Sequence, residues 1–144
     1  MRIGGLVASA LAMASTEEER VTATIMQRYQ ERLAAYQSVD FDDLIGLSLQ
    51  LLTQHDAVRQ RWQDSLAHVL VDEVQDTNAT QYALLKLLLG PHARFTAVGD
   101  DDQSIYGWRG ATLDNLKQLP QDYPNIKVIK LEQNYRSTGA ILQA

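Results

Sequence analysis

The chain has 144 residues, of which 45% are hydrophobic and 22% are charged, and its formal net charge is -5. This is the composition of a globular protein with room for one modest hydrophobic core. The absence of cysteine excludes a disulfide framework and a thiolate zinc site, and the three histidines show no metal-ligand spacing. The acidic balance excludes a broad basic surface, so any contact with nucleic acid should be local.

The amino-terminal stretch 3–14 is apolar, follows Arg2 and imitates a secretory signal. We do not interpret it as a signal, because a single basic residue is too little for the charged region that begins a signal peptide, and the apolar stretch is rich in Gly and Ala. No stretch reaches the roughly 20 apolar residues of a membrane span. We therefore expect no membrane partner and a cytoplasmic location.

The first 64 residues are predicted to be helical. Thr16 with Glu19 matches a capping box, and apolar residues then recur at helical spacing, which predicts an amphipathic helix over 16–37. Asp40 is expected to cap a second helix over 41–54, and a third should follow over 56–64. The residues expected to face a core are Val21, Ile25, Tyr29, Leu33 and Tyr36 in the first helix, and Phe41, Leu44, Ile45, Leu49 and Leu52 in the second.

From residue 66 the pattern changes to strands that alternate with helices. Strands are predicted over 66–71, 94–99 and 126–131, and helices over 78–89, over 113–119 and from near 137, with Gly90-Pro91 ending the first of these helices. Strands separated by helices imply crossover connections and a parallel sheet. The continuous apolar run 66–71 is typical of a strand buried on both faces. The predicted fold class is α/β.

Asp72 and Glu73 follow the first predicted strand directly. Parallel sheets bind their ligands at the carboxyl ends of strands, and two acids there suit Mg²⁺ and a phosphate. One acid can hold the ion while its neighbour polarises the attacking water. A lone Asp-Glu pair could equally cap the next helix or stay solvated.

A second polar group, residues 99–110, follows the second predicted strand. Its three successive Asp repel one another, so we expect them to serve capping, loop bonds or metal-linked water. Gln103 supplies an amide that can touch a phosphate oxygen or orient water. Tyr106 and Trp108 flank a glycine beside Arg109, and aromatic faces with a cation suit stacking on unpaired bases, although core anchoring is an open alternative.

A third group, residues 131–138, follows the last predicted strand. Arg136 could reach a terminal phosphate there, and Tyr135 could stack on a base. Taken alone, the pair would ordinarily be an exposed arginine and a half-buried tyrosine.

Together the three groups resemble the UvrD/Rep/PcrA family of superfamily 1 DNA helicases. Residues 72–78 are similar to helicase motif II, the Walker B element, residues 99–111 to motif III, and residues 133–137 to motif IV. Residues 40–44 resemble the point where that family's inserted helical subdomain returns to the first RecA-like domain. The resemblance implies a partial RecA-like P-loop NTPase domain, a parallel sheet with crossover helices, preceded by a helical segment of the inserted subdomain.

The implied boundaries are 1–64 for the helical segment, 65–131 for the second half of the RecA-like domain, and 132–144 for motif IV and the junction toward the second motor domain. The implied cofactors are ATP and Mg²⁺. By the same resemblance Asp72 would hold the magnesium and Glu73 would be the general base.

The remaining roles follow from the resemblance as well. Gln103 would sense the terminal phosphate, Arg136 would act as an arginine finger, and Tyr135 would stack on adenine. Single-stranded DNA and duplex junctions would be partners through Tyr106 and Trp108. Arg109 would assist there, and together with Gln75 it would couple the DNA site to the ATP site.

The chain departs from the family because no Gly-Lys pair occurs in it, so the phosphate-cradling loop is missing. We expect an internal part of a 3′-to-5′ helicase, inactive without the missing portions. One alternative is a truncated paralogue that binds single-stranded DNA or a helicase partner, and another is a gene fragment without a role. A third is a RecB/AddA-type helicase-nuclease, which usually carries Pro-Lys where Asp101-Asp102 stand.

Overall fold

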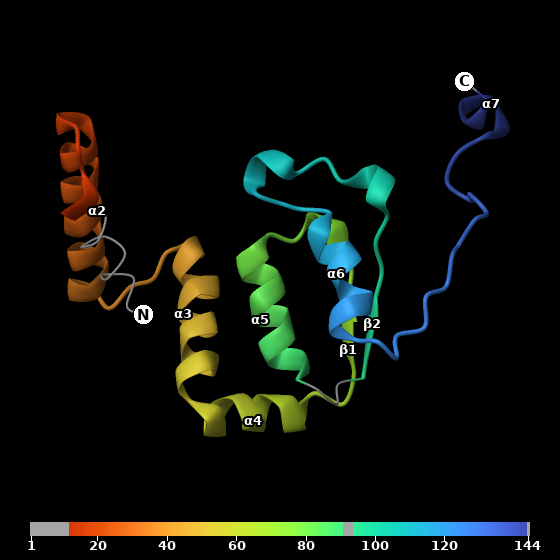
Figure 1. Cartoon of the computed structure of the whole chain (residues 1–144), viewed down its shortest axis with the longest axis horizontal. Helices are drawn as coiled ribbons and strands as arrows, with labels where there is room; N and C mark the ends of the chain where they lie inside the picture. Colours follow the sequence, from red (N-terminus) through yellow and green to blue (C-terminus); the bar gives the residue numbers. More distant parts are fainter. Residues whose placement is uncertain (1–11, 91–93, 144) are drawn as a thin grey trace.

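A computed structural model describes residues 12–90 and 94–143 of the chain (Figure 1). Most of the apolar stretch 3–14 lies outside these residues, and so does Pro91. Within the described ranges, no helix has both the length and the apolar character needed to cross a bilayer.

Three helices form the amino-terminal part: α2 (Glu17–Ala35), α3 (Phe41–Gln54) and α4 (Asp56–Ser65). Both α2 and α3 begin at capping boxes, with Thr16 and Asp40 as the capping residues. The predicted starts of these two helices are confirmed, because the side chains that satisfy the first free N–H groups are encoded locally.

The core role expected for the apolar stripe of α2 is wrong. The helix stands at one end of the molecule, away from the sheet (Figure 1), and its buried residue is Ala23, whereas Ile25 and Tyr36 are exposed. In α3, Phe41 and Leu44 are also exposed, although both were expected to turn inward. Helical spacing predicts an apolar face but not which neighbour covers it, and the part of the chain described places nothing over these side chains.

The sheet consists of β1 (Val69–Val71) and β2 (Phe95–Ala97), which pair in parallel with Val69 opposite Phe95 and Val71 opposite Ala97. The helix α5 (Ala79–Leu89) forms the crossover between them, begins at an Asn78 capping box and ends at Gly90. The fold is therefore mixed helix and strand with a small parallel sheet, as an α/β protein requires. Both strands are shorter than predicted.

The core lies on one face of this sheet. Val74, Tyr82 and Leu119 are buried together, and Phe95 contacts Tyr123 edge to face at 4.8 Å between ring centroids. α5 lies between α3 and the sheet (Figure 1). On the other face Leu70 is 78% exposed, so the expected burial of this strand on both faces is wrong for the described residues.

The third predicted strand, over 126–131, is not formed. After α6 (Asp114–Asp122) the chain runs away from the body as an extended segment and ends in the short helix α7 (Gly139–Leu142) (Figure 1). The β-branched residues of 126–131 indicate extended backbone, but a strand also needs a pairing edge, and no described segment lies in register beside them.

Candidate functional site at the carboxyl ends of the strands

Two loops leave the same edge of the sheet. The first follows β1, carries Asp72 and Glu73, and continues into a 3-10 turn, η1 (Val74–Asp76). The second follows β2 and contains two further 3-10 turns, η2 (Asp101–Gln103) and η3 (Gly107–Arg109). Because β1 and β2 are parallel neighbours, the structure brings the first two predicted groups together.

Glu73 has a left-handed backbone, with φ 51° and ψ 43°. This conformation is sparsely populated by residues other than glycine and costs on the order of 1 kcal/mol or more. Its N–H donates to Asp72 Oδ1 at 2.9 Å, and its carbonyl accepts from the N–H of Asp76 at 2.9 Å. These bonds support the abrupt change from strand to turn and present the glutamate at the sheet edge.

Gln75 joins the two loops from a fully buried position, with 0% of its surface exposed. Its Nε2 donates to Glu73 Oε2 at 2.6 Å, and its Oε1 accepts from the N–H of Asp100 at 3.1 Å. The carboxylate can only accept and the backbone N–H can only donate, so the orientation of this amide is fixed. One oxygen of Glu73 is thereby held in place.

Gly99 permits this close approach of the loops. A Cβ at this position would lie 2.7 Å from Val74 Cγ1 and 2.9 Å from Gln75 Oε1. The backbones also bond here, since the N–H of Val74 donates to Val98 O at 3.0 Å. A side chain at 99 would push the two loops apart.

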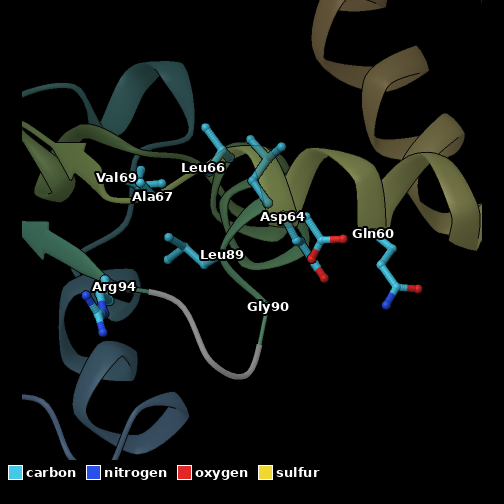
Figure 2. A pocket seen from close by; sticks show the side chains of 10 residues that line it. Gln60, Asp64, Leu66, Ala67, Val69, Leu89, Gly90 and Arg94 are labelled. Carbon is cyan, nitrogen blue, oxygen red and sulfur yellow. The ribbon is translucent and has the colours of Figure 1, made fainter.

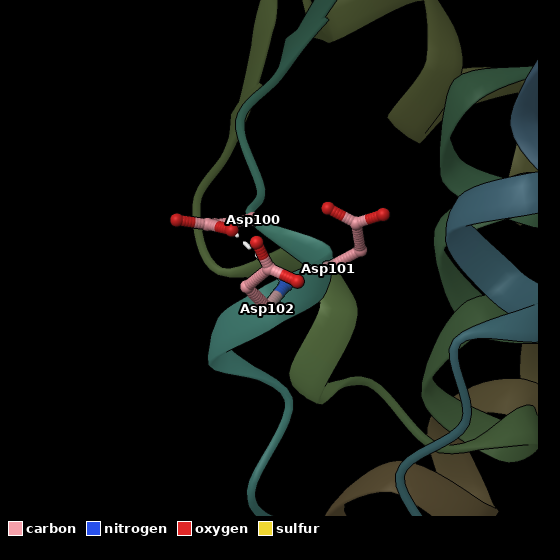
Figure 3. A group of neighbouring side chains, drawn as sticks. All are labelled: Asp100, Asp101 and Asp102. Atoms are coloured by element: carbon pink, nitrogen blue, oxygen red, sulfur yellow. Dashed lines mark hydrogen bonds between the residues drawn. The ribbon is translucent and has the colours of Figure 1, made fainter. Parts of the chain in front are cut away.

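The three acids 100–102 gather at the start of the second loop (Figure 3). All are exposed, and their carboxylate atoms lie within 4.8 Å of one another. Asp100 Oδ1 accepts from the N–H of Asp102 at 3.0 Å, and its Oδ2 accepts from Gln103 Nε2 at 2.7 Å. Asp100 therefore serves loop bonds, one of the expected uses, and Gln103 is held on Asp100.

The aromatic pair sits farther along the second loop. The ring centroids of Tyr106 and Trp108 are 6.4 Å apart at an interplanar angle of 50°, and the two side chains are 37% and 74% exposed. Such exposure excludes a core-anchor role for Trp108 within the described chain. Arg109 is the last residue of η3. The loop then turns at Gly110, whose φ of 81° suits glycine, and Ala111 forms an antiparallel bridge with Asn78.

Tyr135 and Arg136 are not brought to this edge. Both are exposed in the tail that extends away from the body (Figure 1). Asn134 Oδ1 accepts from the N–H groups of Arg136 and Ser137 at 2.9 Å each, which fixes a local turn before α7.

Sequence reasoning missed three polar residues near the site. Asp76 Oδ1 is buried without a hydrogen-bond partner among the described residues. Asn115 is 7% exposed and donates to Thr77. Asp76 and Thr77 lie inside the first motif without an assigned role, and no local sequence pattern pointed to Asn115.

A pocket of about 380 Å³ lies at the opposite end of β1 from Asp72, where α4, α5 and Arg94 meet (Figure 2). Its charged lining residues are Asp64 and Arg94, with leucines and glutamines between them. It contains none of the predicted site residues, so the chemistry argued from the sequence lies at the exposed sheet edge and not in this pocket.

The donor set at the edge suits Mg²⁺. Carboxylate oxygens are the ligands that this ion prefers, and Asp72 presents an exposed carboxylate at the strand end. A triphosphate fits less well, because a phosphate-cradling loop with its lysine is absent from the sequence. The residues present therefore offer donors for a divalent cation but no cradle for a triphosphate.

Known proteins similar to this chain are helicases. The model of the UvrD/REP helicase N-terminal domain matches residues 6–124. The chain is 56% identical to ATP-dependent DNA helicase Rep of Salmonella typhimurium over 95% of this chain and 20% of that protein, and 56% identical to Rep of Escherichia coli over 94% and 20%. It is 43% identical to ATP-dependent DNA helicase PcrA of Staphylococcus aureus over 95% of this chain and 19% of that protein.

The chain thus spans about a fifth of the length of the curated relatives it matches. The family match covers most of its residues, including both loops of the sheet edge. The chain therefore belongs to the UvrD/REP helicase N-terminal domain family.

Proposed function

We propose that this chain is the part of an ATP-dependent 3′-to-5′ DNA helicase that holds Mg²⁺, activates water and stacks single-stranded DNA. The observation that carries the proposal is the buried Gln75 amide, which joins the carboxylate of Glu73 to the backbone of Asp100. The relatives named above are ATP-dependent DNA helicases, which supports the proposal. Under this proposal, residues 65–131 are the second half of a RecA-like P-loop NTPase domain. Residues 1–64 are a segment of the inserted helical subdomain, and residues 132–144 are motif IV and the junction toward the second motor domain.

Asp72 is the proposed magnesium ligand. Its Oδ1 accepts from the N–H of Glu73, so we assign Oδ2 to the ion. When bound, Mg²⁺ supplies neutralisation of the charge on the phosphate oxygens.

Glu73 is the proposed general base. Gln75 donates to Oε2 and so restrains that oxygen, and we assign Oε1 to the proton of the attacking water. Positioned general bases contribute about 10²- to 10⁴-fold to the rate.

Gln103, Tyr135 and Arg136 are proposed to act only in the assembled enzyme. Gln103 donates to Asp100, and must exchange that bond to sense a phosphate. The tail that carries Tyr135 and Arg136 must fold back toward Glu73 before it can stack adenine or supply an arginine finger. The phosphate cradle must also come from residues beyond these 144, so we expect the isolated chain not to hydrolyse ATP.

The test uses a full-length helicase that carries these residues. Glu73→Gln should abolish ATP hydrolysis while ATP binding is retained, because the amide keeps the size of the side chain and can still accept from Gln75 Nε2. Glu18→Gln, the same change at an exposed position on α2, is the matched control. Retained hydrolysis in Glu73→Gln would remove Glu73 from the proposed role, and turnover by the isolated chain would contradict its inactivity.

A second candidate is a non-catalytic module that binds single-stranded DNA. The observation in its favour is that the loop with Tyr106, Trp108 and Arg109 is contained entirely in this chain, with Trp108 exposed. A whole motor needs the absent phosphate cradle, whereas base stacking needs only aromatic faces. A measurement of DNA binding by the isolated chain separates the two candidates.

A further inference from the structure

The loop that carries Tyr106 and Trp108 is anchored at both ends to the turn that follows Glu73. At its start, the N–H of Asp100 donates to Gln75 Oε1 at 3.1 Å. At its end, Ala111 bridges Asn78, and the N–H of Thr112 donates to Thr77 O at 3.2 Å. A displacement of the aromatic loop therefore acts on residues only a few positions beyond the carboxylates.

Asn115, at the start of α6, secures the second anchor. Its Nδ2 donates to Thr77 O at 2.8 Å and to Thr77 Oγ1 at 3.1 Å. The hydroxyl of Thr77 in turn donates to Val74 O at 2.7 Å. Asn115 is 7% exposed, so water cannot readily take over its bonds if they break.

We propose that Asn115 is a positioning residue that couples DNA stacking on Tyr106 and Trp108 to the orientation of Glu73. This inference rests on the proposed function and adds a residue outside the helicase motifs. The route runs from α6 through Asn115 to Thr77, and from Thr77 to the η1 turn that begins directly after Glu73. Coupling of this kind is reciprocal for binding, because each site favours the same arrangement of the turn.

The decisive variant is Asn115→Asp, measured in a full-length helicase that carries this segment. Aspartate has nearly the same shape, but it replaces a donor by an acceptor facing the carbonyl and hydroxyl oxygens of Thr77. Asn125→Asp is the matched control, because Asn125 is exposed in the segment after α6 and the charge change is identical. The measurement is ATP hydrolysis with and without saturating oligothymidylate.

We expect Asn115→Asp to reduce the stimulation by DNA about tenfold, in the usual range of coupling between sites. The rate without DNA should stay within about twofold of the parent, and Asn125→Asp should behave as the parent does. An unchanged stimulation overturns the inference, and so does a parallel fall of both rates, which is the result of a merely structural role.

If the unchanged full-length helicase hydrolyses no ATP, the proposed function is wrong, and the inference about Asn115 is overturned because it rests on that function. If Asn115→Asp does not fold, Thr77→Ser and Thr77→Val provide the same comparison. Serine keeps the hydroxyl that accepts from Asn115, whereas valine keeps the shape without it. We expect the serine variant to retain the stimulation and the valine variant to lose part of it, and equal stimulation in the two overturns the inference.

Discussion

Gln75 Nε2 lies 2.6 Å from Glu73 Oε2, so a fully buried amide holds a carboxylate of an exposed residue. A neutral amide at 75 can donate to a charged carboxylate at 73 without repulsion. The pairing therefore depends on a donor at position 75, and a carboxylate there would repel the one at position 73.

We expect Gln75→Glu to make stability depend on pH. Two adjacent carboxylates repel, so at least one folded-state pKa rises above the unfolded value. Below about pH 4, the ordinary glutamate pKa, the raised pKa leaves the stability of the variant intact. As the pH rises through the raised folded-state pKa, the variant loses stability. Urea denaturation followed by circular dichroism at about pH 4.5 and about pH 7.5 measures this.

Gln121→Glu is the control, since Gln121 is exposed on α6 and gains the same charge. The loss of unfolding free energy in Gln75→Glu should grow with pH relative to this control. A loss that stays constant with pH would contradict the contact between residues 75 and 73.

Gly99→Ala should destabilise the chain by about 1–3 kcal/mol, the ordinary cost of overpacking a filled site. The new Cβ meets Val74 Cγ1 at 2.7 Å and Gln75 Oε1 at 2.9 Å, and both belong to buried residues. Gly107→Ala is the matched control, because nothing lies within 4 Å of a Cβ built there. Equal denaturation midpoints for the two variants would exclude the close packing described for Gly99.

Tyr82 should make the chain less stable at alkaline pH. Its hydroxyl donates to Asp122 Oδ2 at 2.9 Å, and burial together with this bond raises the pKa of Tyr82 well above its ordinary value. The stabilisation is fully present below about pH 10, where tyrosine in the unfolded chain ionises, and is lost as pH rises toward the folded pKa. Unfolding free energies between about pH 8 and about pH 11 test this.

Tyr82→Phe should cost about 1 kcal/mol near neutral pH and weaken the alkaline loss. Tyr36→Phe, at the exposed residue that follows α2, should change neither the stability near neutral pH nor the alkaline loss. An alkaline loss of stability of the same size in Tyr82→Phe as in the unchanged chain would show that Tyr82 does not cause that loss.

Acid should also weaken the contact between Tyr82 and Asp122, through protonation of the Asp122 carboxylate. Burial alone would raise the pKa of Asp122, but hydrogen bonds from Tyr82 and Lys86 outweigh it, and the pKa lies below the ordinary aspartate value. A lowered pKa stabilises the fold above the unfolded value of about 4, and this contribution disappears as pH falls through the folded pKa. Asp122→Asn should therefore show a smaller acid loss than the parent in denaturation between about pH 5 and about pH 2, and an equal loss would contradict the shift.

Trp108→Ala should weaken binding of labelled oligothymidylate to the isolated chain about tenfold or more, because one stacked base contributes about 1–3 kcal/mol. Trp62→Ala is the control, since Trp62 is also exposed but lies on α4. Fluorescence anisotropy titrations give the dissociation constants. Tight binding by the parent, lost only in Trp108→Ala, favours the binding module, whereas no binding by the parent excludes it.

Local chemistry made the helices predictable. Asp40 and Asn78 encode their own helix starts through capping boxes, and Gly90 supplies the positive φ with which α5 ends. Strand 126–131 failed because pairing is not local: a β-branched run forms a strand only where another edge accepts it. The prediction that the apolar side chains of α2 face a core was wrong for the same reason, since helical periodicity does not specify which element packs against the helix.

The sequence predicted which loops form the candidate site, but not the contacts between them. Two polar groups after parallel strands must emerge at one edge, and Asp72 and Asp100 do. The bond from Asp100 to Gln75 could not be foreseen, because it depends on the register of β1 against β2 and on the turn made by Glu73. Asn115 was hidden for a related reason, as its partner Thr77 lies 38 positions earlier in the chain.

The outward face of β1, with Leu70 uncovered, has a consequence for motion near the acids. A sheet of two strands with one packed face is marginal in water, so its amide protons should exchange with deuterium sooner than those of α5, which packs against α3 and α4. Asp72 and Glu73 continue directly from β1 and share its local opening. A segment packed over Leu70 would slow that exchange and would also restrict the motion of the two carboxylates.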